Sequence, residues 1–405
     1  MVFVGIDWSE EWHDVELQSE SGKRLRSLRV GHGVEGLTQL QASIAEFTDD
    51  PEQVIVAVES SHGLLVQALV AGGYVVYDIN PLVAARYRER HSLAGAKSDP
   101  RDAEMLANLV RTDRHKFRRL AGDSERALEI RARARAHLRA SRDKVRLRNQ
   151  LRSLLLEYYP ATASLLGEDD LQDALAILSI APGPELGRRL SLSKLESTLR
   201  RHGRQREVPQ RAARLQQRLR ESQLELGLPL VVSALADEAT SLSRRLLQMQ
   251  QEIAWLEEQL AAAFRLHPDA EIYLSFTGLA DVLGARVLGE SGDDPARYAN
   301  ARARRNYAAS SPVTKASGRH REVHRRVARN RRLADATFLW AERAIQNSPG
   351  ARSYFDKLIA SGHGHNEAVR ATANKLIGFL HACLRDHQPY DELKAWTSQQ
   401  LKTAA

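Results

Sequence analysis

Four carboxylates in the first quarter of the chain have a spacing that could support metal-dependent chemistry. Asp7 follows an apolar N-terminal run, Glu59 follows a β-branched run at residues 54–58, and Asp99 and Asp102 lie three residues apart. That spacing places Asp99 and Asp102 on one face of a predicted helix. If the acids converge, two carboxylates about 4 Å apart repel by roughly 4 kcal/mol at an effective dielectric of about 20, so the site needs a cation.

Oxygen-only ligands favour Mg²⁺ or Mn²⁺. Two such ions about 3.5–4 Å apart could hold the attacking and leaving oxygens of a phosphodiester during an in-line displacement, which is nuclease-type chemistry. Taken singly, these acids also have structural explanations. Ser98-Asp99-Pro100 has the pattern of a helix start with Asp99 as its cap, and Asp102 then falls in the first turn, where acids suit the helix dipole.

A serine near the end of the chain is a second candidate for covalent chemistry. Ser317 precedes Gly318 in a loop-like segment, and five arginines lie between residues 325 and 332. A serine hydroxyl becomes a nucleophile only when a base takes its proton and cations neutralise the attacked phosphate. Arginines meet the second requirement, but the spacing fixes neither His320 nor His324 beside Ser317. Composition alone favours a Gly-Ser turn beside a phosphate-binding helix, without covalent chemistry.

The elements that must position the four acids form an α/β pattern. Short alternating or β-branched runs predict strands at residues 2–6, 15–17, 25–30, 54–58 and 74–79. Helical patterns lie at residues 34–47 and 63–71, and a further helix carries Asp99 and Asp102. The order is three strands, helix, strand, helix, strand, helix. The buried strand at residues 54–58 should lie inside the sheet, because it is apolar on both faces.

Basic and heptad-patterned helices are predicted after residue 120. Residues 124–159 read as one long helix with many arginines and few acids, and such a density of like charge favours a phosphate-lined partner over a bare solvated face. Apolar residues from Leu242 to Leu260 alternate four and three apart, which is a heptad seam. The seam spans about three heptads, so it predicts either a helical hairpin within one chain or a dimeric coiled coil.

Composition narrows the classes of protein that fit. The 405 residues carry 59 basic and 51 acidic side chains, a net charge of +8 and a pI near 9.6, which favours a polyanionic partner. The single Cys383 excludes a disulfide framework and a cysteine zinc site within one chain. There is no run of 18 uncharged apolar residues, and the N-terminus reads as a strand, so we expect no membrane partner and a cytoplasmic, nucleoid-associated protein.

Three segments in order resemble one known family. Gly5-Ile6-Asp7-Trp8, Val58-Glu59-Ser60-Ser61 and residues 96–103 resemble the RuvC-like domain of the DEDD transposases of bacterial insertion sequences, the IS110 family. Further on, Pro312, four residues and Ser317-Gly318 resemble the family's C-terminal transposase motif. One departure is that Ala309 stands where the family usually has glycine, and alanine tolerates most turn conformations except positive φ.

The resemblance implies a fold, a division into domains and a set of partners. It implies an α/β ribonuclease H-like (RuvC-like) domain at 1–120, a basic, mostly α-helical region containing a coiled coil at 121–267, and an α-helical C-terminal serine transposase domain at 268–405. The implied partners are donor and target DNA, a noncoding bridge RNA that chooses both by base pairing, and further copies of the chain, with homodimers assembling into a tetramer. Asp7, Glu59, Asp99 and Asp102 are then the magnesium-binding tetrad.

In the same resemblance Ser317 is the nucleophile that holds cleaved DNA as a phosphoserine ester. We choose Arg135, Arg139, Arg146 and Arg319 as candidates for nucleic-acid contact. Two rival functions stay open. In a metal nuclease of the Holliday-junction-resolving type, the tetrad does all the cutting and Ser317 is a bystander. In a nonenzymatic nucleic-acid-binding scaffold, the acids are helix caps and only salt-sensitive binding remains.

Overall fold

The computed structural model describes residues 1–59, 63–91, 99–120, 122–167, 171–221, 223–224, 226–317, 320–324, 326 and 329–396. The chain forms two compact units. The first comprises Met1–Ser124 and Gly292–Asn300, and the second comprises Glu125–Ser291 and Ala301–Ala405. These two units do not test the predicted division into three regions ending at residues 120, 267 and 405, which stays a prediction.

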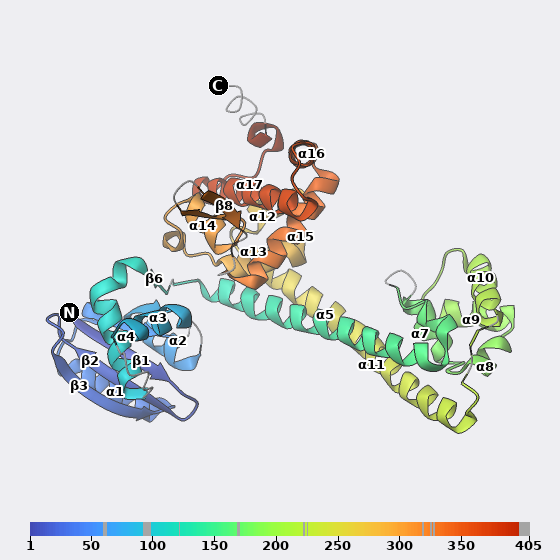
Figure 1. The fold of residues 1–405 in the computed structure, drawn as a ribbon, viewed down its shortest axis with the longest axis horizontal. Helices are drawn as coiled ribbons and strands as arrows, with labels where there is room; N and C mark the ends of the chain where they lie inside the picture. Colours follow the sequence, from blue (N-terminus) through green and yellow to red (C-terminus); the bar gives the residue numbers. More distant parts are fainter. Residues whose placement is uncertain are drawn as a thin grey trace. The chain divides into compact units, whose positions relative to one another are not determined.

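A mixed sheet of six strands forms the base of the first unit. The strands are β1 (Val2–Trp8), β2 (Trp12–Gln18), β3 (Arg24–Gly31), β4 (Val54–Val58), β5 (Val75–Asp78) and the two-residue β6 (Arg118–Arg119). Their order is β3-β2-β1-β4-β5-β6. Figure 1 labels β1, β2 and β3 of this sheet. β1 pairs with β4, and β4 with β5, in parallel, while the remaining neighbours are antiparallel. As expected, the β-branched β4 is buried along its whole length, inside the sheet.

Helices cover both faces of this sheet. They are α1 (Val34–Ala45), α2 (Leu64–Ala71), α3 (Pro81–His91) and α4 (Asp99–Asp113). On one face, Val4 and Val56 pack with Leu40 of α1 and Leu69 of α2. On the other, Phe3 packs with Leu106 of α4. This arrangement confirms the α/β organisation expected from the sequence, although α3 and β6 were not predicted.

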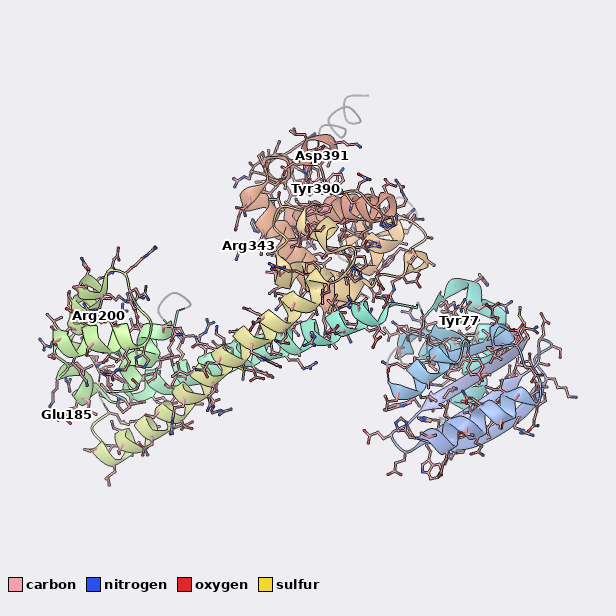
Figure 2. The ribbon with its side chains drawn as sticks, turned by 180° about the vertical axis from the view of Figure 1, so that it is seen from behind. Tyr77, Glu185, Arg200, Arg343, Tyr390 and Asp391 are labelled. Carbon is pink, nitrogen blue, oxygen red and sulfur yellow. The ribbon has the colours of Figure 1, made fainter. Side chains whose placement is uncertain are left out.

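The long basic helix and the heptad segment form an antiparallel hairpin in the second unit. α5 (Glu125–Tyr158) lies along α11 (Pro229–Arg265), as Figures 1 and 2 both show. The start of α5 shares a hydrophobic core with the end of α11, through Ala134 and Leu260. The end of α5 shares another core with the start of α11, through Leu151 and Leu242. The hairpin interpretation of the heptads is therefore confirmed within one chain.

Short helices between α5 and α11 in the sequence pack at the end of the hairpin where α5 ends and α11 begins. They are α6 (Pro160–Ala163), α7 (Leu171–Leu178), α8 (Pro184–Arg188), α9 (Leu192–Arg201) and α10 (Val208–Arg220). Asp173 of α7 is buried and accepts hydrogen bonds from Arg204 Nε at 2.8 Å and Arg211 Nε at 2.6 Å. This pairing of one buried carboxylate with two guanidinium groups joins α7 to α10 and to the loop that precedes it.

The C-terminal part of the second unit is helical around one β-hairpin. Its elements are α12 (Ala270–Leu274), α13 (Asp281–Ser291), α14 (Ala301–Tyr307), β7 (Val313–Ser317), β8 (His320–His324), α15 (Arg331–Asn347), α16 (Pro349–Ala360) and α17 (His365–Asp386). Trp340 is fully buried and meets Phe276 edge-on. Phe276 in turn stacks on Tyr390, with ring centroids 4.2 Å apart (Tyr390 is labelled in Figure 2). Within the described residues, no helix is both long enough and apolar enough to cross a bilayer.

Candidate active site

Two of the predicted acids follow neighbouring parallel strands. Ile6 of β1 is in register with Val58 of β4, so Asp7 and Glu59 occupy the next positions at the carboxyl edge of the sheet. Neighbouring strands lie about 4.8 Å apart. Both side chains are half-exposed. Because side chains alternate along a strand, Asp7 projects from the face of the sheet opposite to that of Ile6.

Gly5 lets α4 approach that same face. A Cβ placed on Gly5 would lie 1.9 Å from the carbonyl oxygen of Ala103 and 2.4 Å from the amide nitrogen of Ala107. The backbone of α4 therefore crosses β1 in direct contact, two residues before Asp7. Asp102 adjoins Ala103 in the chain, so this contact fixes the helix that carries Asp102 against the strand that carries Asp7.

Asp102 is the buried member of the acidic set. It is 3% exposed, and Arg88 of α3 donates from Nε to its Oδ1 at 2.7 Å. A buried carboxylate needs such a partner, because leaving its charge unpaired costs several kcal/mol. Arg88 was not among the residues predicted from the sequence. The Asn80-Pro81 start of its helix was the available signal, since the Asn80 side chain caps α3 by accepting from Leu82 N at 2.9 Å.

The donor chemistry of these acids suits a hard divalent cation. Asp7, Glu59 and Asp102 offer only carboxylate oxygens, which Mg²⁺ and Mn²⁺ prefer. Among the side chains that the structure describes, no group of three or more His, Cys, Asp or Glu residues has metal-binding geometry. Asp99 is the first residue of α4, one turn before Asp102, but its side chain and residues 92–98 lie outside the described set. The residue types thus fit the cation, and Arg88 occupies one oxygen of Asp102.

Ser317 lies at the tip of the β7–β8 hairpin. It pairs with His320 in the last register position, and the side chains of both, with Gly318 and Arg319, lie outside the described set. His324 pairs with Val313 at the other end of the hairpin, four residues along the strand from His320. That separation is about 13 Å at 3.3 Å per residue. Of the two histidines near Ser317 in sequence, only His320 is opposite it.

The segment leading into β7 has an unusual backbone. Ala309 has a φ of 57°, in the left-handed region that favours glycine. This is the position where the sequence departs from the resembled family by having alanine. Alanine at this position therefore has a backbone conformation that L-residues rarely adopt, which costs roughly 1–2 kcal/mol.

The four arginines chosen for nucleic-acid contact lie in different surroundings. Arg135 of α5 makes two hydrogen bonds to Glu290 of α13, at 2.7 and 3.0 Å, and Glu290 is 4% exposed. Burial acts to raise the pKa of Glu290, but the hydrogen bonds from Arg135 and Asn330 outweigh it and hold that pKa below its ordinary value. Two nitrogens of Arg135 therefore take part in an ion pair with a buried carboxylate.

The other three differ from Arg135. Arg139 is exposed on α5. Arg146 is 79% exposed and pairs with Asp143 one turn before it. Arg319 lies outside the described residues. Contact of Arg135, Arg139, Arg146 and Arg319 with nucleic acid stays a prediction.

Comparisons with known proteins agree along the whole chain. A family model for DEDD transposases of the IS110 type, described as "Transposase", matches residues 4–160. A second model, described as "Transposase IS116/IS110/IS902 family", matches residues 270–356. The chain is 43% identical over 400 residues to the "Mini-circle putative transposase for IS117" of Streptomyces coelicolor, covering 98% of this chain and 96% of that protein. It is 28% identical over 404 residues to the "Insertion element IS900 uncharacterized 42 kDa protein" of Mycobacterium paratuberculosis, covering 96% of this chain and 97% of that protein.

Proposed function

Because the chain belongs to the IS110 family of insertion-sequence transposases, which cleave and rejoin DNA, we propose that it excises and inserts its own element as a site-specific, RNA-guided recombinase. The main support for the proposal is the placement of acidic residues at the carboxyl edge of the sheet. Asp7 and Glu59 occupy adjacent positions there, and α4 brings Asp102 against the same strand. A fold has little reason to end two neighbouring strands in carboxylates for packing alone.

In this proposal the four acids bind the metal ion, and Ser317 attacks the DNA. Asp7, Glu59, Asp99 and Asp102 hold Mg²⁺, or Mn²⁺, which supplies charge neutralisation at the scissile phosphate when bound. Arg88 orients the Asp102 carboxylate through the hydrogen bond from its Nε. The first unit then has a ribonuclease H-like (RuvC-like) fold, to which its mixed sheet with helices on both faces conforms in outline.

Ser317 is the proposed nucleophile. Its Oγ loses a proton to a base and forms a bond to the phosphorus, while the bond from phosphorus to a deoxyribose oxygen breaks and that oxygen takes a proton. A phosphoserine ester links protein and DNA at this point. A hydroxyl of the second strand then attacks the same phosphorus and releases Ser317 Oγ, so each rejoining reverses the bond changes of the cleavage. His320 is the histidine opposite Ser317 in the hairpin.

Guidance by a bridge RNA and assembly of dimers into a tetramer complete the proposal. The excess of arginine supports binding through phosphates, with the choice of sequence left to base pairing. The heptad seam supports the dimer. Leu246 and Leu260 lie in the two cores at the ends of the hairpin, but Met249, Ile253 and Leu256 between them are only half-buried within one chain. A second copy of the chain would cover them.

Excision of the natural element in cells tests the proposal. We expect Asp7→Asn, Glu59→Gln and Ser317→Ala each to abolish the excision junction detected by PCR, by 10³-fold or more in order of magnitude. Asp49→Asn and Ser353→Ala remove a similar group at exposed positions of the same units and should leave excision unchanged. Magnesium-dependent cutting that survives in Ser317→Ala would instead favour the nuclease.

A further inference from the structure

A groove with both polar and apolar lining residues adjoins the segment that leads into β7. It consists of two neighbouring hollows of about 310 and 290 Å³, whose linings share Ala309, Ser310 and Arg370. The start of α15 and Arg329 line the first hollow, and Arg326 and Asn374 line the second. The groove belongs entirely to the C-terminal part of the second unit.

Hydrogen bonds shape the floor of the groove. The Oγ atoms of Ser310 and Ser311 both donate to Oδ1 of Asn374, at 3.0 and 3.1 Å. Ser310 Oγ also lies 3.2 Å from the backbone oxygen of Arg305. With its carbonyl oxygen engaged by two hydroxyls, the side chain of Asn374 has its amide nitrogen left as a donor. The floor therefore presents a donor held in place by the loop itself.

Three arginines, Arg326, Arg329 and Arg370, line the groove. Arg326 donates to neutral oxygens, Ser311 O at 3.4 Å and Asn306 Oδ1 at 3.2 Å, and Arg329 donates to the backbone oxygen of Arg326 at 2.8 Å. The buried Nε of Arg329 has no hydrogen-bond partner among the described residues. No described carboxylate lies within ion-pair distance of Arg370.

Both acids in the lining contact a basic side chain outside it, and the cations near Asn374 repel one another. Asp335 pairs with Arg142 at 3.2 Å, and Glu367 with His363 at 3.1 Å. Next to Asn374, burial lowers the pKa of Lys375 and the charge of Arg305 lowers it further. Fixed donors and an excess of guanidinium groups along one groove are the features of an anion site, and the planar fork of arginine matches a phosphate.

We propose that this groove binds a backbone phosphodiester of the DNA strand and so positions that strand for Ser317. The inference rests on the function proposed above and adds Arg326, Arg329 and Arg370 as positioning residues. β7 joins the groove to Ser317. Five residues at 3.3 Å each reach about 16 Å. The bound phosphate thus lies within about five nucleotides of the scissile one, at 3.4 Å per nucleotide along the duplex axis.

The salt dependence of DNA binding tests the groove apart from cleavage. The full-length Ser317→Ala chain is titrated into a fluorescein-labelled duplex DNA of arbitrary sequence at several KCl concentrations, and anisotropy gives Kd. We expect Arg370→Gln to weaken binding about ten-fold at low salt and to reduce the slope of log K against log salt by about one. Arg370→Lys, which keeps the charge, should keep the slope.

Matched controls distinguish the loss of a specific phosphate contact from a general loss of positive charge and from misfolding. Arg343→Gln removes the same charge from an exposed position of α15 outside the groove (Arg343 is labelled in Figure 2). This variant should change Kd by less than about two-fold. Arg326→Gln should repeat the result of Arg370→Gln. Circular dichroism must match the parent for each variant.

Two results would overturn the groove assignment. One is that Arg343→Gln weakens DNA binding as much as Arg370→Gln does. The other is that Arg370→Gln weakens binding only to a single-stranded RNA probe, which would make RNA the source of the phosphate. The proposed function fails separately. If Arg370→Gln weakens DNA binding as expected while the wild-type chain cuts DNA without an adduct at Ser317, the groove stands and the serine mechanism does not.

Discussion

Replacing Gly5 by alanine should displace Asp102 relative to Asp7 without changing either carboxylate. The added Cβ would lie 1.9 Å from Ala103 O and 2.4 Å from Ala107 N, whereas ordinary contacts begin at 3.4 Å. Both neighbours are backbone atoms of α4, so no side chain can rotate away. The helix must retreat from β1 by about 1.5 Å, or β1 must bend by as much.

The displacement has two consequences whose sizes can be stated. Overpacking of this kind costs about 2 kcal/mol, which lowers the melting temperature of a unit of this size by about 8 °C. Moving Asp102 by about 1 Å relative to Asp7 should reduce catalysis by about 10²-fold. Calorimetry of the full-length chain measures the first effect, and the excision frequency measures the second.

Gly31→Ala is the matched control in the same sheet. A Cβ on Gly31 meets only the ring of Trp12, at 3.7 Å, which is an ordinary contact. We expect a change in melting temperature of about 1 °C or less and unchanged excision. A Gly5→Ala chain that melts and excises like the wild type would refute the close packing of α4 on β1, and with it the placement of Asp102.

Further substitutions test other parts of the structure. Ala309→Gly should raise the free energy of unfolding by about 0.5–1 kcal/mol, because the relief of the left-handed conformation exceeds the entropy cost of glycine; urea titration measures it, and a loss of stability would show that the loop does not need positive φ. Burial, and then the charge of His32, lower the pKa of His13, so the unfolded chain binds the proton more readily and stability falls as the pH drops below about 6.5. His13→Gln should therefore make the melting temperature less sensitive to pH between about 7 and 5, and an unchanged sensitivity would contradict this. Asp173→Asn leaves its two arginine partners without a countercharge and should cost about 3 kcal/mol, seen as a lower urea midpoint; an unchanged midpoint would mean that the buried ion pairs contribute nothing.

Elements defined by their own hydrophobic pattern were predictable. The strand at residues 54–58 is predictable because a short, continuous and mostly β-branched apolar run favours a strand buried on both faces. The helix of residues 125–158 was located to within one residue at each end, because no glycine or proline interrupts it and Pro160 follows. The heptads predicted the α11 seam but could not choose between a partner in the same chain and one in another.

Features that depend on distant residues were not predictable. Arg135 was chosen because it lies in a run of basic residues, yet its ion-pair partner Glu290 is 155 positions away. The acidic tetrad was proposed without Arg88, because the polar and charged sequence of α3 has no clear apolar stripe. Neither contact has a local signature, since each forms only when the sheet or the hairpin brings separate helices together.

The covalent state of Ser317 tests the central claim most directly. The wild-type chain is incubated with DNA that carries the element's own end, denatured and digested, and the peptide containing Ser317 is analysed by mass spectrometry. We predict a nucleotide attached to Ser317, absent in Ser317→Ala and in Asp7→Asn. Strand cleavage that proceeds in the wild type with no adduct on this peptide would contradict the account.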